Sequence, residues 1–189
     1  MNEINKTANP NDSKWYVMRD LKRSNAKEPA WKILSEMDFE VFTPMHWKLF
    51  IHQGKRNRKL VPVMSDLLFV YSDKIKLDEV VRKTPTLQFR FTRKKHCEPI
   101  TIKEKEMTRF INAVGNFEKV KYYTSDELNS GFKGKRVRII GGILNGYEGL
   151  LLSVRGSKTK RLLVELPDLL TAGVEVNPEY IEIIGNEEA

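Results

Sequence analysis

Short stretches of alternating hydrophobic and polar residues run through the first 115 residues, separated by stretches whose apolar residues recur at helical spacing. A two-residue period is typical of half-buried strands, and a period near 3.6 residues is typical of amphipathic helices. The pattern therefore predicts an α+β domain over residues 14–115. Strands are expected at residues 15–18, 39–43, 67–71 and 87–91, and helices at 26–37 and 77–83, with a third helix that opens at 99–101 and ends before Gly115.

Residues 46–60 form a stretch with its own pattern, HWKLFIHQGKRNRKL. Apolar and polar residues alternate up to Ile51, a turn is expected near Gln53-Gly54, and basic residues follow. Glycine supplies positive φ in tight turns, so the stretch predicts a projecting β-hairpin with a basic tip. Residues 67–71, by contrast, are continuously apolar, which suits a central strand covered on both faces.

Residues 134–152 read GKRVRIIGGILNGYEGLLL, in which a basic alternating strand is followed by glycines and an apolar run. The glycines Gly142, Gly146 and Gly149 have a spacing that resembles the KOW motif of transcription and ribosomal proteins. The resemblance implies a small, SH3-like β-barrel over residues 131–185, joined to the first domain by a polar linker at 116–130. Later strands are expected at residues 161–166, 173–176 and 180–184.

The net charge of +8 is confined to one part of the 189-residue chain. Residues 131–189 hold 8 Lys and Arg against 8 Asp and Glu, whereas residues 1–130 hold 25 against 17. An excess of Lys and Arg steers association with polyanions or acidic proteins. A solvated lysine-rich surface explains the same excess equally well.

The few residues with metal-binding or nucleophilic chemistry lack the spacing that such sites need. Cys97 is the only cysteine, and His46, His52 and His96 are the only histidines. We therefore expect no disulfide, a reducing compartment, no metal, no cofactor and no enzyme activity. No stretch approaches the roughly 20 apolar residues of a membrane span, so a cytoplasmic protein is expected. Residues 1–13 are expected to form a disordered leader and residues 186–189 a tail.

Three groups of residues in the first domain, in this order, resemble the NusG family of transcription factors. They are Trp15-Tyr16-Val17, Thr43-Pro44-Met45 followed by Gly54-Lys55-Arg56, and Leu67-Leu68-Phe69-Val70. With the KOW-like region, the resemblance implies an antiparallel sheet flanked by helices, a linker and a C-terminal barrel. Within the family the chain is similar to RfaH and to the UpxY-type antiterminators of surface-polysaccharide operons. One departure is Ser65-Asp66-Leu67, where the family usually carries Pro-Gly-Tyr.

The resemblance implies that the first domain binds RNA polymerase through an apolar depression on its sheet. The matching residues are Trp15, Tyr16, Phe42, Leu67, Phe69 and Tyr71. Because side chains alternate along a strand, we favour Leu67, Phe69 and Tyr71 on one face, with Trp15 or Phe42 as neighbours. The alternative is that each of these side chains belongs to the internal core.

The basic hairpin and the barrel are expected to serve other partners. For the hairpin we expect contact with upstream or non-template DNA through Trp47, Lys55, Arg56, Arg58 and Lys59, with Phe50 as a second stacking residue. A merely solvated hairpin is the alternative, and the cluster of Arg90, Arg93, Lys94 and Lys95 is expected to be solvated. For the barrel, the resemblance implies a ribosomal protein or another elongation or termination factor, at Gly142, Gly146, Gly149, Leu166, Leu169 and Leu170. These leucines could instead fold back onto the barrel.

The function that follows is that of a monomeric antitermination and elongation factor that suppresses pausing and promotes read-through in selected operons. A general NusG-type elongation and termination factor is the nearest alternative. An RNA- or ribosome-binding KOW protein is the alternative from another class. That protein would need a basic barrel, and the charge of residues 131–189 is balanced.

Overall fold

The computed structural model describes residues 13–22, 27–92, 98–115, 120–123, 134–153, 160–166, 169–176 and 181–186. The chain divides into two compact units, Met1–Glu104 and Lys105–Ala189. Helix α3 (Glu104–Gly115) therefore falls almost wholly in the second unit, whereas the sequence pattern had assigned it to the first domain. The expected leader before Ser13 and the end of the expected tail lie outside the described residues.

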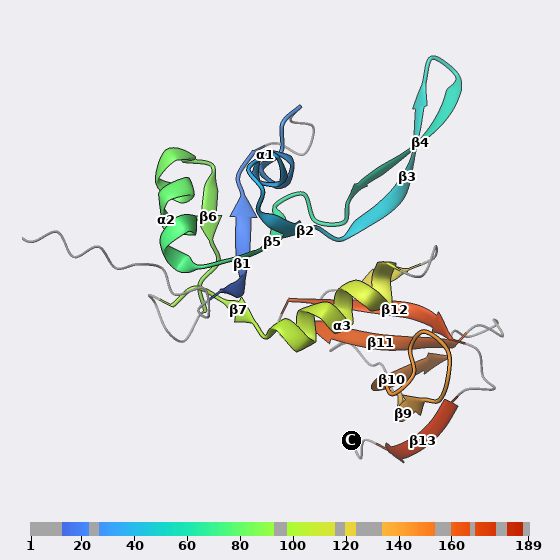
Figure 1. Ribbon diagram of the computed structural model, residues 1–189. Coiled ribbons are helices and arrows are strands. Elements are labelled where there is room, and N and C mark those ends of the chain that lie inside the picture. The colour runs from blue at the N-terminus through green and yellow to red at the C-terminus, as the bar shows by residue number, and fades with distance from the viewer. Residues whose placement is uncertain are drawn as a thin grey trace, which may run out of the picture. The chain divides into compact units, whose positions relative to one another are not determined.

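The first unit is built on an antiparallel sheet with the strand order β2-β5-β1-β6, to which β7 adds by pairing with β1 (Figure 1). Its central strands are almost entirely buried, as expected for strands covered on both faces. The strands are β1 (Lys14–Asp20), β2 (Glu40–Phe42), β5 (Leu67–Ser72), β6 (Leu87–Phe89) and β7 (Thr101–Ile102).

Two helices, α1 (Ala30–Glu36) and α2 (Lys74–Lys83), supply the core on one face of this sheet. Leu34 and Leu77 from the helices are buried in one cluster with strand residues that alternate along β1 and β5. The strand residues are Tyr16, Met18, Leu68 and Val70. The predicted α+β class is therefore confirmed.

Strand β7 replaces the expected start of the third helix. Thr101 was expected to cap that helix, but Ile102 instead pairs with Trp15 and is buried, and the helix begins at Glu104. The run Ile100-Thr101-Ile102 is rich in β-branched residues, which favour strands. A tertiary contact has thus overridden a local capping signal.

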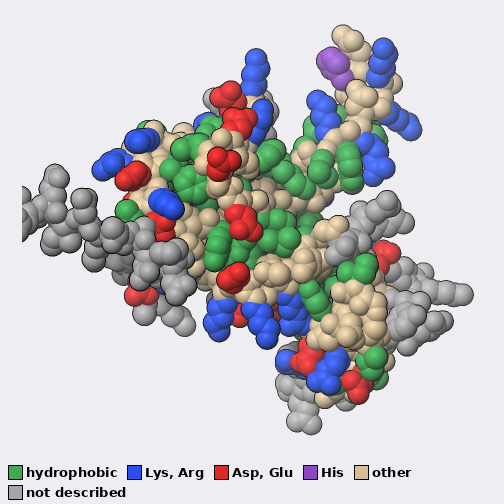
Figure 2. All heavy atoms as spheres, viewed as in Figure 1, with side chains coloured by type: hydrophobic (Ala, Val, Ile, Leu, Met, Phe, Trp, Pro, Cys, Tyr) green, Lys and Arg blue, Asp and Glu red, His purple; other side chains and the backbone are tan. Residues whose placement is uncertain are grey.

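Residues 45–62 form the predicted hairpin as a separate two-stranded sheet of β3 (Met45–His52) and β4 (Lys55–Pro62). The turn residues Gln53 and Gly54 have φ of 49° and 74°, and positive φ at both central positions is what a type I′ turn requires. The hairpin projects from the rest of the first unit in Figure 1, and basic side chains and a histidine lie near its end in Figure 2.

The second unit is a six-stranded antiparallel sheet with the order β13-β9-β10-β11-β12-β8. We call it the C-terminal sheet, and it confirms the prediction of a β-rich C-terminal region. Its edge strand β8 lies inside the stretch 116–130 that was expected to be a linker. The strands are β8 (Lys121–Tyr123), β9 (Lys135–Ile139), β10 (Glu148–Ser153), β11 (Lys160–Leu166), β12 (Leu170–Val176) and β13 (Ile181–Asn186).

The glycines of the KOW-like stretch have two structural roles. Gly142 and Gly146, in the turn between β9 and β10, have φ of 68° and 77°, which side-chain-bearing residues rarely adopt. At Gly149 the requirement is space, because an added Cβ would run into the carbonyl oxygen of Leu163 on β11. The motif is therefore explained by the backbone of this sheet.

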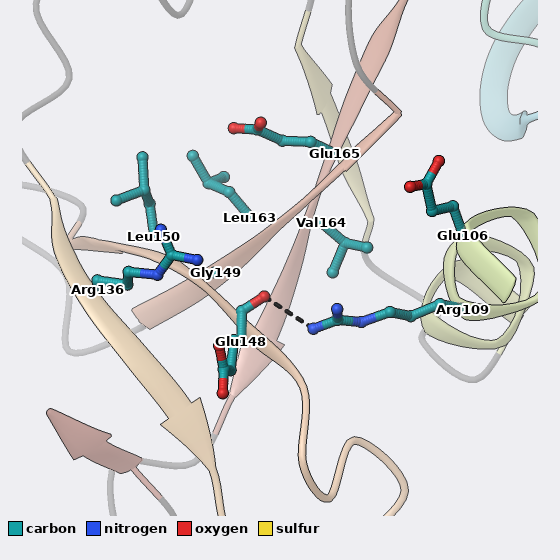
Figure 3. Close-up of a pocket in the computed structure, with 9 residues that line it drawn as sticks. All are labelled: Glu106, Arg109, Arg136, Glu148, Gly149, Leu150, Leu163, Val164 and Glu165. Atoms are coloured by element: carbon teal, nitrogen blue, oxygen red, sulfur yellow. Dashed lines mark hydrogen bonds between the residues drawn. The ribbon is translucent and has the colours of Figure 1, made fainter. Parts of the chain in front are cut away.

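Helix α3 is held to β10 and the turn before it by polar contacts, of which Figure 3 shows the one between Arg109 and Glu148. The Arg109 guanidinium donates to the carbonyl oxygen of Glu148 at 2.8 Å, and the Tyr147 hydroxyl donates to the carbonyl oxygen of Arg109 at 3.1 Å. The same guanidinium lies 4.7 Å from the centre of the Tyr147 ring. A cavity of about 250 Å³ lies beside these residues, with Arg136 and Glu165 also in its wall.

Candidate functional site

One face of the first sheet carries most of the residues predicted to bind a partner. The register places Trp15 opposite Tyr71, and Phe42 opposite Phe69, with Leu67 two residues away on the same face. Ring centres lie 5.5 Å apart for Trp15 and Tyr71, and 6.1 Å apart for Phe42 and Phe69. We call these five residues the aromatic face, and the predicted sharing of one face by the three residues of β5 holds in the structure.

Tyr16 has to be removed from this set, because it lies on the opposite face of the sheet. Its side chain is buried in the cluster under α1 and α2 and meets the Phe89 ring edge-on, with centres 5.7 Å apart. Successive side chains of a strand point to opposite faces, so Tyr16 cannot share a surface with Trp15. The sequence pattern had included both residues.

The residues of the aromatic face differ in accessibility. Trp15, Leu67 and Phe69 are at most 3% exposed, whereas Phe42 and Tyr71 are half-buried. For Trp15, Leu67 and Phe69 this burial fits the alternative that they belong to the internal core, and on this face Phe42 and Tyr71 are the two that keep surface accessible to a partner. Partial burial, together with the Glu104 carboxylate 3.5 Å from the Tyr71 hydroxyl, raises the pKa of Tyr71 and keeps the hydroxyl protonated.

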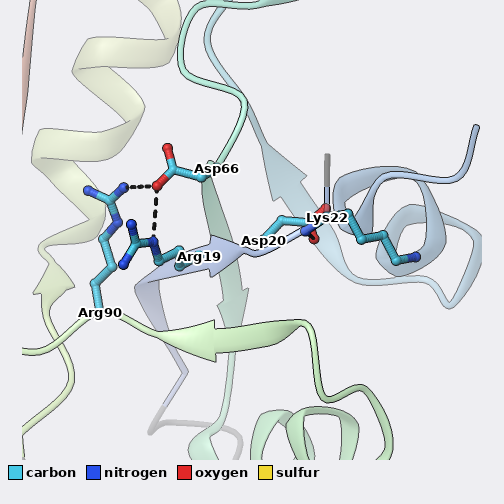
Figure 4. Close-up of polar contacts among 5 residues, drawn as sticks. All are labelled: Arg19, Asp20, Lys22, Asp66 and Arg90. Carbon is cyan, nitrogen blue, oxygen red and sulfur yellow. Dashed lines mark hydrogen bonds and ion pairs between the residues drawn. The ribbon is translucent and has the colours of Figure 1, made fainter. Parts of the chain in front are cut away.

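A pair of arginines meets a carboxylate beside the aromatic face (Figure 4). Arg19, directly opposite Leu67, donates from Nε to Asp66 Oδ2 at 3.1 Å, and Arg90 donates from Nη2 to the same oxygen at 2.9 Å. Arg90 was expected to be solvated, so this ion pair corrects that expectation, while residues 93–95 lie outside the described residues. Sequence analysis missed the cluster, although Asp66 at the departure from the family pattern was its signal.

Asp20, at the end of β1, connects the sheet to the first helix (Figure 4). Its buried carboxylate accepts from the backbone N–H of Ala30 at 2.7 Å and from that of Lys22 at 2.9 Å. The N-cap residue Pro29 offers no side-chain acceptor, so Asp20 satisfies a donor that would otherwise be unpaired at the start of α1. Asp20 therefore supports the fold beneath the aromatic face.

The register of the hairpin sorts its side chains onto two faces. The apolar face carries Trp47, Leu49, Ile51 and Leu60, together with Arg56 and Arg58. The lysine face carries His46, Lys48, Phe50, His52, Lys55 and Lys59. The residues predicted to bind DNA are therefore divided, since Trp47, Arg56 and Arg58 lie on the apolar face, and Lys55 and Lys59 on the lysine face.

Each face of the hairpin has an aromatic ring, with one cation near it on the apolar face and two on the lysine face. The Arg58 guanidinium lies 5.6 Å from the centre of the Trp47 ring on the apolar face. On the lysine face, Lys48 Nζ and Lys59 Nζ lie 5.8 and 5.9 Å from the centre of the Phe50 ring. Residues 45–62 hold five Lys and Arg and no Asp or Glu, and nearly all are exposed.

In the C-terminal sheet, burial changes the predicted contact surface. Leu166 and Leu170 are buried and Leu169 is half-buried, so this turn folds back onto its own sheet, and residues 167–168 lie outside the described residues. Exposed apolar side chains lie elsewhere. Ile140 and Ile143, beside the glycine turn, and Ile183 on β13 are all more than half exposed. Sequence analysis missed them because isolated isoleucines do not signal exposure.

Among the described residues, no three His, Cys, Asp or Glu side chains gather as metal ligands would. Likewise, none of the helices in the described ranges is long and apolar enough to cross a membrane. Cys97 and His96 lie outside these ranges.

An aromatic sheet face, an exposed basic hairpin and a β-rich second unit fit a protein of the transcription machinery. The family described as "Transcription termination factor nusG" matches residues 13–111, which is more than half of the chain. The chain belongs to the NusG family. Members of this family are non-enzymatic transcription factors that typically interact with RNA polymerase.

Solved structures include a similar chain, reported as "Domain interaction in Thermotoga maritima NusG". The similarity covers 93% of this chain and 99% of that chain, with 17% sequence identity and a TM-score of 0.49. No curated protein matches the sequence.

Proposed function

We propose that this NusG-family chain is an elongation and antitermination factor that binds RNA polymerase, suppresses pausing and promotes read-through of terminators. The observation that carries this proposal is the aromatic face, which lies on the sheet of the region that matches the NusG family. Phe42 and Tyr71 offer partly exposed rings above the buried Phe69. Rings with one accessible side are well suited to anchor an apolar partner surface.

The mechanism that we propose is mechanical. The first unit would bind across the polymerase cleft and hold the clamp closed, so that the elongating conformation is favoured over the paused one. Such a shift needs only a difference in affinity for the two conformations. The half-buried rings of Phe42 and Tyr71 on the aromatic face would supply the attachment point.

Specialised action in selected operons, such as those for surface polysaccharides, is the finer part of the proposal. It is supported by the hairpin, whose five cations project toward solvent and can contact upstream or non-template DNA. Phosphate contacts give affinity and position, whereas operon choice needs contacts to bases. A general elongation and termination factor is the second candidate, favoured by the description of the matching family.

The C-terminal sheet is proposed to recruit a protein partner, such as a ribosomal protein or another transcription factor. Balanced charge over residues 131–189 does not favour a polyanion. The exposed isoleucines Ile140, Ile143 and Ile183 provide apolar surface that a protein could cover.

The test is retention of cognate RNA polymerase on the immobilised protein, with two matched variants. Phe42→Ala removes a half-buried ring from the aromatic face, and Phe89→Ala removes a half-buried ring from the opposite face of the same sheet. We expect Phe42→Ala to weaken retention about tenfold and Phe89→Ala to leave it within about twofold. Failure of the wild type to retain polymerase would refute the proposal.

A second experiment separates specialised from general action. Transcription through a terminator is measured on templates with and without the operon's own leader sequence. Read-through that requires the leader supports the specialised role. Equal effects on both templates would establish the general factor instead.

A further inference from the structure

We propose that the lysine face of the hairpin is a platform for a single-stranded polynucleotide, with phosphates held at Lys48 and Lys59 and a base stacked on Phe50. This inference rests on the proposed function, because it specifies which surface of the factor meets nucleic acid. It adds Lys48 to the contact, keeps Phe50 as the stacking residue, and removes Arg56 and Arg58 from the contact.

The first argument is the placement of like charges. The register sets Lys48 directly opposite Lys59. Directly opposed residues have Cβ atoms about 5 Å apart, and like charges at that distance destabilise a sheet. With no carboxylate between Met45 and Pro62, the hairpin itself offers no relief. An anion seated between Lys48 and Lys59 removes this repulsion, and a phosphate is such an anion.

The second argument is the position of the Phe50 ring. Phe50 is 38% exposed, and Lys48 Nζ and Lys59 Nζ lie within 6 Å of the centre of its ring. A base that stacks on an aromatic ring brings its phosphates to the edge of that ring, where these two ammonium groups can reach them. Stacking on an aromatic ring needs an unpaired base, which is why a single strand fits better than a duplex.

The apolar face also has an exposed ring, Trp47, but only one cation lies near that ring, and no two cations on this face are directly opposed. Arg58 is opposite Leu49 and Arg56 is opposite Ile51, so each cation on this face faces an aliphatic side chain. Leu49, Ile51 and Leu60 are more than half exposed, and the Arg58 guanidinium lies over the Trp47 ring. Aliphatic side chains offer no stacking surface to bases. This face is suited to an apolar protein surface with acidic residues.

The experiment compares single charge reversals on the two faces. Lys48→Glu and Arg58→Glu each change the charge by the same amount on an exposed position of the same hairpin. Binding of labelled single-stranded DNA and RNA of one mixed sequence is measured by fluorescence anisotropy, with duplex DNA as the control. Measurement at about 150 mM salt screens charges beyond about 8 Å and so limits long-range effects.

We expect Lys48→Glu to weaken single-strand binding about tenfold and Arg58→Glu to weaken it less than about threefold. Phe50→Ala is expected to cost about tenfold, and Trp47→Ala less than about twofold. Because Glu at position 48 would face Lys59, Lys48→Glu should also protect the hairpin amides from hydrogen exchange. Loss of binding in a better-formed hairpin cannot come from unfolding.

Three results would overturn the inference: equal losses on the two faces, tighter binding of the duplex than of either single strand, or no single-strand binding by the wild type. Each can occur while the wild type still retains polymerase, so the proposed function would survive. Conversely, a lysine-face preference without polymerase retention would refute the function and keep the platform. If Arg58→Glu instead reduces only polymerase retention, the apolar face meets protein and the division of the hairpin is supported.

Discussion

The hairpin and the C-terminal sheet handle their charges in opposite ways. In the sheet, Arg138 contacts Glu148 at 2.7 Å and Glu182 at 3.6 Å, and Arg161 contacts Glu175 at 3.2 Å. In the hairpin, five cations stand on two strands without one carboxylate among them. Paired charges complete a fold, whereas a run of cations without acids is suited to an external anion. The comparison teaches that whether charged side chains are paired distinguishes a scaffold from a binding surface more clearly than the net charge of each region does.

The largest expected effect is a destabilisation of the C-terminal sheet, which the comparison treats as the scaffold. Gly149→Ala would place a Cβ against the carbonyl oxygen of Leu163, and because that oxygen is backbone and the Cβ is fixed to Cα, the strands must separate. We expect destabilisation of the C-terminal sheet by about 3 kcal/mol, measured as loss of amide protection in β10 and β11. Single-strand binding by the hairpin should stay unchanged. Gly115→Ala, where an added Cβ meets nothing within 4 Å, is the control.

A smaller effect concerns the hairpin and is measured as the salt dependence of its binding to a single strand. Two phosphates held at Lys48 and Lys59 predict a slope of about −1.4 in a log–log plot of affinity against salt. Raising salt from about 50 to about 200 mM should therefore weaken single-strand binding about sevenfold. Lys48→Glu should flatten this slope and Arg58→Glu should preserve it. A slope that neither variant changes would place the phosphates elsewhere on the chain.

The smallest effect concerns pH and the paired charges. The hydrogen bond from Arg138, opposed in part by desolvation, lowers the pKa of Glu148 below its model-compound value of 4.5. The unfolded chain therefore takes up the proton first as pH falls, so the stabilisation is complete above about pH 4.5 and is lost below it. Thermal unfolding between pH 6 and pH 3 should show a smaller loss for Arg138→Gln than for the wild type. Equal losses would mean that another carboxylate dominates.

The pattern of neighbouring residues was sufficient to predict elements that are held together by contacts close in sequence, such as the hairpin. The period of β3 and β4 and the Gln53-Gly54 turn were sufficient for the hairpin, and they also imply the pairing of His52 with Lys55. The two faces could therefore have been derived from the sequence, by counting back from the turn. They were missed because the basic residues were treated as one cluster.

Contacts between distant segments explain what the sequence did not predict. Strand β8 has only three residues in a polar stretch, and it becomes a strand because β12 offers it an edge. Leu166 and Leu170 were predicted as a contact surface because their sequence is apolar, but that same property buries them. The Arg19–Asp66 contact joins residues 47 positions apart, which no periodicity can reveal.

The Gln53-Gly54 turn sets how readily the hairpin forms. A glutamine at φ of 49° is strained where asparagine would be at ease, and two-stranded ribbons are marginal on their own. Part of the free energy of any contact made by the hairpin would then go into holding its two strands together. Gln53→Asn, which tolerates this positive φ better, is expected to stabilise the hairpin and so to tighten whatever it binds.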